Sequence, residues 1–211
     1  MGMADGLEAE PAVAQRVFGE RLDLVRRFVA NLDREGEARG LIGPVERPRL
    51  WSRHILNCGV VAELLRPGRV GDIGTGAGLP GLVLAISRPD VSFVLIEPME
   101  RRVQWLQEQV VDLGLENTTI LRARAQDVRD QRFLDQVTAR AVSSLAKLLP
   151  LTAPLVRDGG ELVLMKGARI SEEINAARTV LNRFRVHEAE VVLLGEELLD
   201  EPTRVFRARV R

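Results

Sequence analysis

The residues with the clearest chemical potential are an acid and the run of glycines after it. Asp72 lies in a short apolar run and is followed by Gly74, Gly76, Gly78 and Gly81. Glycine lets the backbone turn sharply out of a strand and pass close to a ligand, because it has no Cβ. A second apolar run ends in Glu97, 23 positions after Gly74, near the ~20-residue spacing at which a second-strand carboxylate meets ribose hydroxyls. The pattern predicts a nucleoside-cofactor site on an open α/β sheet.

The glycine run is compatible with more than one nucleoside cofactor. Residues 76–81 fit the G-x-G-x-x-G pattern of dinucleotide enzymes, so a nicotinamide oxidoreductase is one alternative. Asp72 would face an incoming pyrophosphate with a like charge, whereas it suits the ammonium of a methionine moiety. The chain after the loop also lacks an evident His or Tyr–Lys group for the proton of hydride transfer. We therefore expect S-adenosylmethionine; a glycine turn without a ligand is the remaining alternative.

Size and composition indicate one α/β domain with an extension. The chain has 211 residues, one cysteine and a net charge of zero, which excludes an internal disulfide and binding of nucleic acid by bulk charge alone. We expect no metal site, no secretory signal and no membrane span, and hence a cytoplasmic protein. Of the 30 basic residues only Lys147 and Lys166 are lysines. The arginine excess permits an RNA partner without requiring one.

The elements that must position these residues follow from periodicity. Apolar residues at helical spacing predict helices over 11–32, 50–65, 80–88, 100–113, 146–156 and 172–183. Strands are expected over 70–73, 92–96, 119–122, 136–142, 161–165, 185–194 and 204–211. The alternation favours a parallel sheet covered by helices, with an antiparallel pair at the end. The carboxyl ends of the parallel strands then bring to one rim Asp72, Glu97, residues 124–127, Arg140 and Lys166.

Several blocks of the chain, from about residue 49 to 167, carry a resemblance to a known family. They are Arg53-His54-Ile55-Leu56-Asn57, residues 72–81, Arg88-Pro89-Asp90, Arg101-Arg102-Val103 with Leu106, Leu115-Glu116-Asn117, residues 140–145 and Met165-Lys166-Gly167. In these blocks the chain resembles the glucose-inhibited division protein B family, the bacterial guanine-N7 methyltransferases of 16S ribosomal RNA. The resemblance implies a Rossmann-like, seven-stranded S-adenosylmethionine-dependent methyltransferase sheet over 67–211, with an N-terminal helical extension over 1–66. Where many members carry Asn-Leu-Thr, this chain has Gly40-Leu41-Ile42.

The resemblance also implies roles for individual residues. By position, the cofactor residues of the family fall on Gly74, Leu79, Ala125, Gln126 and Arg140; the glycine loop adds Gly76 and Gly78 beside Asp72 and Glu97. Arg140 is also the candidate catalytic residue, and it could hold the cofactor carboxylate, an RNA phosphate or guanine O6. The candidate RNA contacts are Arg53, Arg101 and Lys166, whereas we expect His54 only to cap and pack its helix. The implied partner is 16S ribosomal RNA or the small ribosomal subunit; the oligomeric state stays open, with a monomer as the default.

Motifs that the sequence lacks restrict the range of possible methyl acceptors. The segment after the fourth expected strand lacks the Asn/Asp-Pro-Pro-aromatic block that is usual for exocyclic amines, and Cys58 lies outside any motif for pyrimidine C5 attack. Guanine N7 has a lone pair and no proton to lose, so alignment is sufficient. A methyltransferase with a small-molecule or protein acceptor remains an alternative. On the last expected strand we interpret Arg204, Arg207 and Arg209 as one face, solvated or phosphate-binding.

Overall fold

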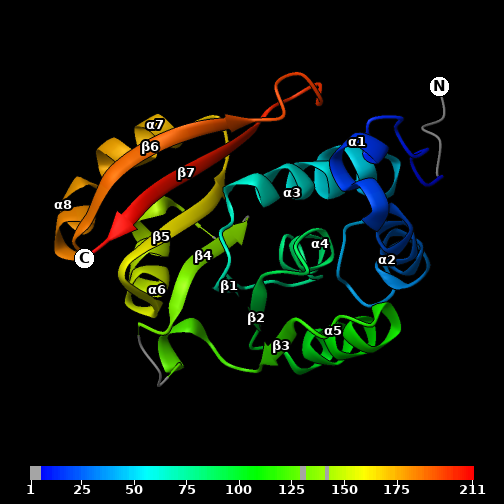
Figure 1. The fold of residues 1–211 in the computed structure, drawn as a ribbon, viewed down its shortest axis with the longest axis horizontal. Coiled ribbons are helices and arrows are strands. Elements are labelled where there is room, and N and C mark those ends of the chain that lie inside the picture. The colour runs from blue at the N-terminus through cyan, green and yellow to red at the C-terminus, as the bar shows by residue number, and fades with distance from the viewer. Residues whose placement is uncertain (1–5, 129–131, 141–142) are drawn as a thin grey trace.

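The computed structural model describes residues 6–128, 132–140 and 143–211, and their strands form one seven-stranded sheet (Figure 1). The strand order is β3-β2-β1-β4-β5-β7-β6. Only β7 runs antiparallel to its neighbours, β5 and β6. The strands are β1 Arg69–Ile73, β2 Ser92–Ile96, β3 Thr118–Leu121, β4 Leu134–Arg140, β5 Val156–Lys166, β6 Val186–Leu194 and β7 Thr203–Val210. The predicted parallel sheet with a terminal antiparallel pair is confirmed.

The sheet changes direction of winding between β1 and β4. From β1 the chain moves outward through β2 to β3, and it then returns to β4 on the other side of β1. In such sheets a crevice opens beyond the carboxyl ends of the two central strands. Asp72 pairs in register with Leu95 of β2 and Thr138 of β4, so both the glycine loop and the end of β4 lie at this crevice.

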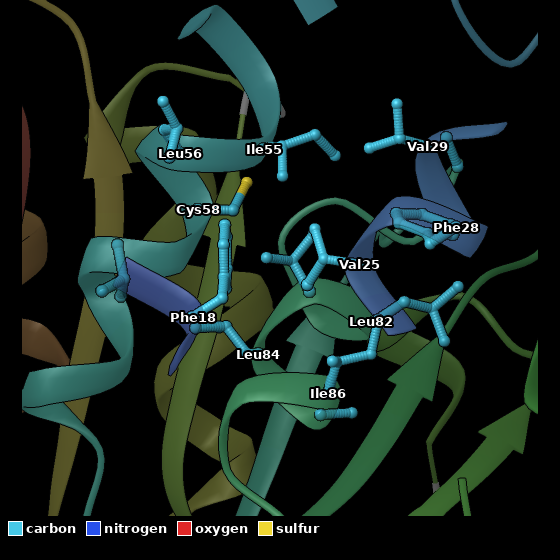
Figure 2. Packing of buried hydrophobic residues seen from close by; sticks show 14 of the residues in the cluster. Phe18, Val25, Phe28, Val29, Ile55, Leu56, Cys58, Leu82, Leu84 and Ile86 are labelled. Carbon is cyan, nitrogen blue, oxygen red and sulfur yellow. The ribbon is translucent and has the colours of Figure 1, made fainter. Parts of the chain in front are cut away.

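Helices cover both faces of the sheet. One face is covered by the N-terminal helices, α4 Gly81–Ser87 and α5 Glu100–Leu113, in a cluster that includes Phe28, Trp105 and Phe93. Figure 2 shows Phe18, Val25 and Phe28 of the N-terminal helices packed near Leu82 and Leu84 of α4. The other face packs against α6 Leu145–Thr152, η6 Ala153–Leu155, α7 Ile170–Ala176 and α8 Arg178–Arg183. The result is a three-layer arrangement.

The N-terminal helices are more broken than the periodicity predicted. The first expected helix divides into α1 Ala14–Phe18, the 3₁₀ turn η1 Gly19–Arg21 and α2 Leu22–Glu35, since Gly19 adopts a positive φ of 52°. A short 3₁₀ turn, η2 Arg47–Arg49, then precedes the second expected helix. That helix is a π-helix, η3 Leu50–Leu56, followed by α3 Asn57–Gly59 and the 3₁₀ turn η4 Val60–Leu64. Among the described helices, none combines the length and apolar character of a membrane span.

Candidate active site

The glycine loop leaves β1 at the centre of the sheet and turns back toward β2. The Gly74 N–H donates to the carbonyl oxygen of Ile96 at 2.9 Å, which ties the start of the loop to the end of β2. Gly78 has a φ of +94°, and a Cβ at this position would lie 2.3 Å from Cδ1 of Leu82. The loop therefore requires glycine there for its backbone conformation and for its packing. Leu79, one of the cofactor residues that the resemblance implied, follows it and is half-buried.

Glu97 is brought against the glycine loop, as the spacing predicted. Its carboxylate is buried, and Oε2 accepts a hydrogen bond from the Gly76 N–H at 3.0 Å. Oε1 accepts from the Met99 N–H at 3.0 Å, and Nη1 of Arg102 lies 3.8 Å from Oε2. A carboxylate offers about four lone-pair sites, so this one keeps capacity for two hydroxyl donors. The carboxylate at the end of β2 can thus accept from both ribose hydroxyls of a nucleoside.

Asp72 is a buried acid with one unpaired oxygen. The side chain is inaccessible to solvent, and Oδ2 accepts from the Gly81 N–H at 2.8 Å. Among the described residues, Oδ1 has no hydrogen-bond partner. Burial raises the pKa of Asp72 to about 7, while the nearby Thr75 hydroxyl, the Gly81 hydrogen bond and the Arg140 charge act in the opposite direction. The Thr75 hydroxyl does not reach hydrogen-bond geometry with Oδ1, since its own Oγ1 is also without a partner among the described residues. A buried acceptor without a partner is costly, and a bound ammonium would supply the missing donor. The residues present therefore fit the methionine part of S-adenosylmethionine.

Arg140 ends β4 and reaches across the crevice to the π-helix. Its guanidinium donates to Nδ1 of His54, and Nη1 also lies 3.4 Å from the His54 carbonyl oxygen and 3.2 Å from Sγ of Cys58. Arg140 is half-buried, and its charge also acts on the Asp72 carboxyl. We expected His54 only to cap and pack its helix, and this expectation missed its contact with Arg140. The Arg53-His54-Ile55-Leu56 block was the one signal in the sequence that could have indicated it.

Two further cofactor positions that the resemblance implied, Ala125 and Gln126, lie at the same rim, beyond β3. Ala125 and Gln126 form the short 3₁₀ turn η5 Ala125–Asp127, the former half-buried and the latter exposed. The Glu97 N–H donates to the carbonyl oxygen of Leu121 at 3.2 Å, so the ends of β2 and β3 are level. The position of η5 is compatible with an adenine edge, and the roles of Ala125 and Gln126 stay predictions.

A cavity of about 430 Å³ opens beside Arg140. Arg53, Arg140, Lys166 and Arg204 line it, so the structure brings together two of the three candidate RNA contacts. Nζ of Lys166 is already occupied, since it donates to the Ser143 carbonyl oxygen at 2.8 Å and pairs with Glu173 at 2.7 Å.

The remaining candidate positions lie elsewhere or are not described. Arg101 does not line the cavity beside Arg140; its guanidinium lies close to Gly40 at the start of α5. Ala141 and Val142, two members of the block that begins at Arg140, lie outside the described residues.

The three arginines of β7 do not share a face, so that prediction is wrong. Arg207 pairs with the buried Glu161 at 3.0 Å, and Arg209 lies 3.9 Å from the same carboxylate. Arg204 instead lines the cavity beside Arg140. Side chains of a strand alternate between its faces, so residues three apart point to opposite sides. Arg204 is therefore available to an anion in the cavity, whereas Arg207 and Arg209 lie on the opposite face of β7, beside Glu161.

The sheet order and the glycine–acid pair together define the fold of S-adenosylmethionine-dependent methyltransferases. A solved structure of a SAM-dependent methyltransferase from Aquifex aeolicus superposes with a TM-score of 0.60 at 18% identity, covering 82% of this chain and 98% of that one. The TYW2 structure from P. horikoshii in complex with MeSAdo gives 0.59 at 14% identity, covering 74% and 62%.

Sequence comparison gives the particular family. Residues 21–201 match the GidB family, described as rRNA small subunit methyltransferase G. The ribosomal RNA small subunit methyltransferase G of Leifsonia xyli subsp. xyli is 66% identical over 99% of this chain and 100% of its own length. That of Paenarthrobacter aurescens is 52% identical over 97% and 95%. The chain belongs to this family of ribosomal RNA methyltransferases, as its sequence blocks predicted.

Proposed function

We propose that this protein transfers a methyl group from S-adenosylmethionine to N7 of a guanine in 16S ribosomal RNA. The observation that carries the proposal is the place of Arg140 between two half-sites. On one side its charge acts on the buried Asp72 carboxyl, and on the other it lines the cavity that Arg53 and Arg204 also line. A cofactor site and a cationic acceptor site thus meet at one side chain. RNA phosphates are the natural ligands of such arginines.

The chemistry asks little of the protein beyond alignment. S-adenosylmethionine supplies a methyl group on a positively charged sulfur. We assign Asp72 to the ammonium of the amino-acid part and Glu97 to the ribose hydroxyls, because the first has an unpaired buried oxygen and the second keeps free lone pairs. Arg140 orients the cofactor or the acceptor base. Since N7 loses no proton, orientation and exclusion of water supply the catalysis.

The three predicted RNA contacts have different roles in this proposal. Arg53 is exposed at the cavity, and its Nε lies 3.6 Å from Oε2 of Glu46, so it can turn to a phosphate. Lys166 acts mainly by holding Ser143 in place. Arg101 would contact RNA at the other end of the rim. We place this activity in the cytoplasm, where ribosomal subunits are assembled.

The product of N7 methylation provides the test. Attack by N7 leaves a positive charge on the guanine ring, which makes the nucleotide prone to reductive depurination and aniline scission. Small-subunit RNA, naked or assembled into the subunit, should gain one scission site at a guanine after treatment with the protein and S-adenosylmethionine. Arg140→Ala should lower the methylation rate strongly through lost alignment. Methylated RNA that resists scission, with the label on an exocyclic amine or a ribose oxygen, would exclude N7 and leave the cofactor site unaffected.

A further inference from the structure

Three side chains from separate parts of the chain form a continuous line at the crevice. Glu46 lies in the loop before η2, His54 on the π-helix η3, and Arg140 at the end of β4. Nε2 of His54 is 2.5 Å from Oε2 of Glu46, and the opposite ring nitrogen, Nδ1, contacts the Arg140 guanidinium. The side chains of His54 and Glu46 are only 11% and 18% exposed. Neither member of this pair holds the cofactor or the acceptor in the proposed function.

The partners of His54 determine which ring nitrogen carries the proton. A neutral imidazole has one donor and one acceptor nitrogen, an ionised carboxylate only accepts, and a guanidinium only donates. Nε2 must therefore carry the proton toward Glu46, which leaves the Nδ1 lone pair for the N–H of Arg140. The opposite tautomer would set a lone pair against a carboxylate and a donor against a donor. Hydrogen bonds can therefore be donated in one direction only, from Arg140 to His54 and from His54 to Glu46.

Arg140 depends on this arrangement for its orientation. In the described part of the chain its hydrogen bonds go to His54 and to Sγ of Cys58, so both terminal nitrogens of the guanidinium are held where the side chain lines the cavity. A freely rotating arginine would sample many orientations, at a cost in side-chain entropy when it aligns a ligand. We propose that His54 is a positioning residue that holds Arg140 toward the cavity, and that Glu46 fixes the required tautomer of His54.

The surroundings of His54 favour the neutral imidazole that the hydrogen bonds require. Burial lowers the pKa of His54 below its ordinary value, the Arg140 charge and the more distant Arg53 lower it further, and Glu46 acts in the opposite direction. Cys58 and Arg49 complete the surroundings, the first at Arg140 and the second paired with Glu46 at 2.8 Å. Protonation would remove the acceptor at Nδ1 and set two cations against each other. The positioning is therefore lost on the acid side of neutrality and retained above it.

The tautomer can be measured without any activity assay. The chain contains two histidines, so ¹⁵N-histidine labelling gives two ring systems, and a His187→Ala variant assigns them. His187 is the matched control, because it lies on β6 beside Glu188 and away from Arg140. At neutral pH we expect Nδ1 of His54 to have the shift of an unprotonated nitrogen and Nε2 that of a protonated one. The reverse assignment, or a rapid mixture of both tautomers, would overturn the proposal.

Kinetics test the consequence for catalysis, which rests on the proposed function. At saturating S-adenosylmethionine, His54→Ala should lower kcat by about tenfold or more, since small misplacements at a reacting site are costly. His54→Asn retains an acceptor near the Nδ1 position and should recover much of the loss, without the fall in rate at acid pH. Glu46→Gln removes the anion that raises the His54 pKa, so that acid limb should move to lower pH. His187→Ala should leave the rate and the pH profile unchanged.

The possible outcomes separate the two proposals. If the wild-type protein does not methylate guanine N7, the proposed function fails, whereas the tautomer measurement still decides the role of His54. If wild-type methylation occurs and His54→Ala keeps the wild-type kcat, His54 does not position Arg140. Equal losses in His54→Ala and His54→Asn, with the acid limb unchanged in Glu46→Gln, would mean a merely structural contribution and would also overturn the proposal.

Discussion

The substitution Asp72→Asn tests whether the buried carboxyl at the centre of the crevice has a raised pKa. The first measurement is the stability of the protein in the absence of cofactor. Raising the pKa of Asp72 from 3.8 to about 7 costs the native state roughly 4 kcal/mol once the carboxyl is ionised. Because the native state holds this proton more tightly than the unfolded state, stability falls as pH rises between these two values. Asparagine never ionises, but its amide places a donor where Oδ1 has no partner, at a cost of about 1–3 kcal/mol. The variant should therefore be more stable than wild type at pH 8 by about 1–3 kcal/mol.

Urea unfolding of both proteins at pH 5 and pH 8 isolates this contribution. Other carboxyls have lowered pKa values, such as those of Glu10 and Asp90, and they make the folded protein more stable as pH rises. They are present in both proteins, so their contributions cancel in the comparison. The change in stability between the two pH values should thus be less unfavourable in Asp72→Asn than in wild type. An identical pH dependence in the two proteins would refute the assignment of a raised pKa to Asp72.

The same substitution reports on the cofactor. The ammonium of S-adenosylmethionine should hold Asp72 ionised, so binding to wild type at pH 7 should release roughly half a proton, because the free carboxyl has a pKa of about 7. Calorimetry in two buffers of different ionisation enthalpy measures this release. Asp72→Asn should abolish it and should weaken S-adenosylmethionine more than methylthioadenosine, which lacks the amino-acid part. Equal losses for both ligands would mean that Asp72 does not face the ammonium.

Three further substitutions test other parts of the arrangement. Glu97→Ala should weaken S-adenosylmethionine by roughly 1.5–3 kcal/mol in calorimetry, because a charged acceptor of two hydroxyls is lost; unchanged affinity would remove Glu97 from the site. Gly78→Ala should destabilise the fold by about 1–3 kcal/mol, because its Cβ would clash with Leu82 at a positive φ, and thermal unfolding measures this. Glu161→Ala should cost about 1–3 kcal/mol by leaving Arg207 without its buried partner, while cofactor affinity stays as in wild type.

The sequence predicted the half of the site that depends on local patterns. Asp72 and the glycines follow one another along the chain, and Glu97 lies at the end of the next strand, so a parallel sheet necessarily brings them together. Helix continuity was less predictable. Apolar periodicity over 50–65 is the same for an α-helix and for a helix that contains a π-helical turn, because both present an apolar face to the core. The structure has the π-helix at Leu50–Leu56, and this changes the direction in which its polar side chains point.

The second half of the site depends on contacts that no local pattern contains. His54 and Arg140 are 86 positions apart, and they meet only because η3 crosses the carboxyl end of β4. A single histidine within an apolar helix is ordinarily a packing residue, so the sequence alone favoured that interpretation. The two blocks that begin at Arg53 and Arg140 nevertheless carried the family resemblance together. The contact between His54 and Arg140 gives a physical reason for this: each block supplies one partner of the interaction that orients Arg140 toward the acceptor cavity.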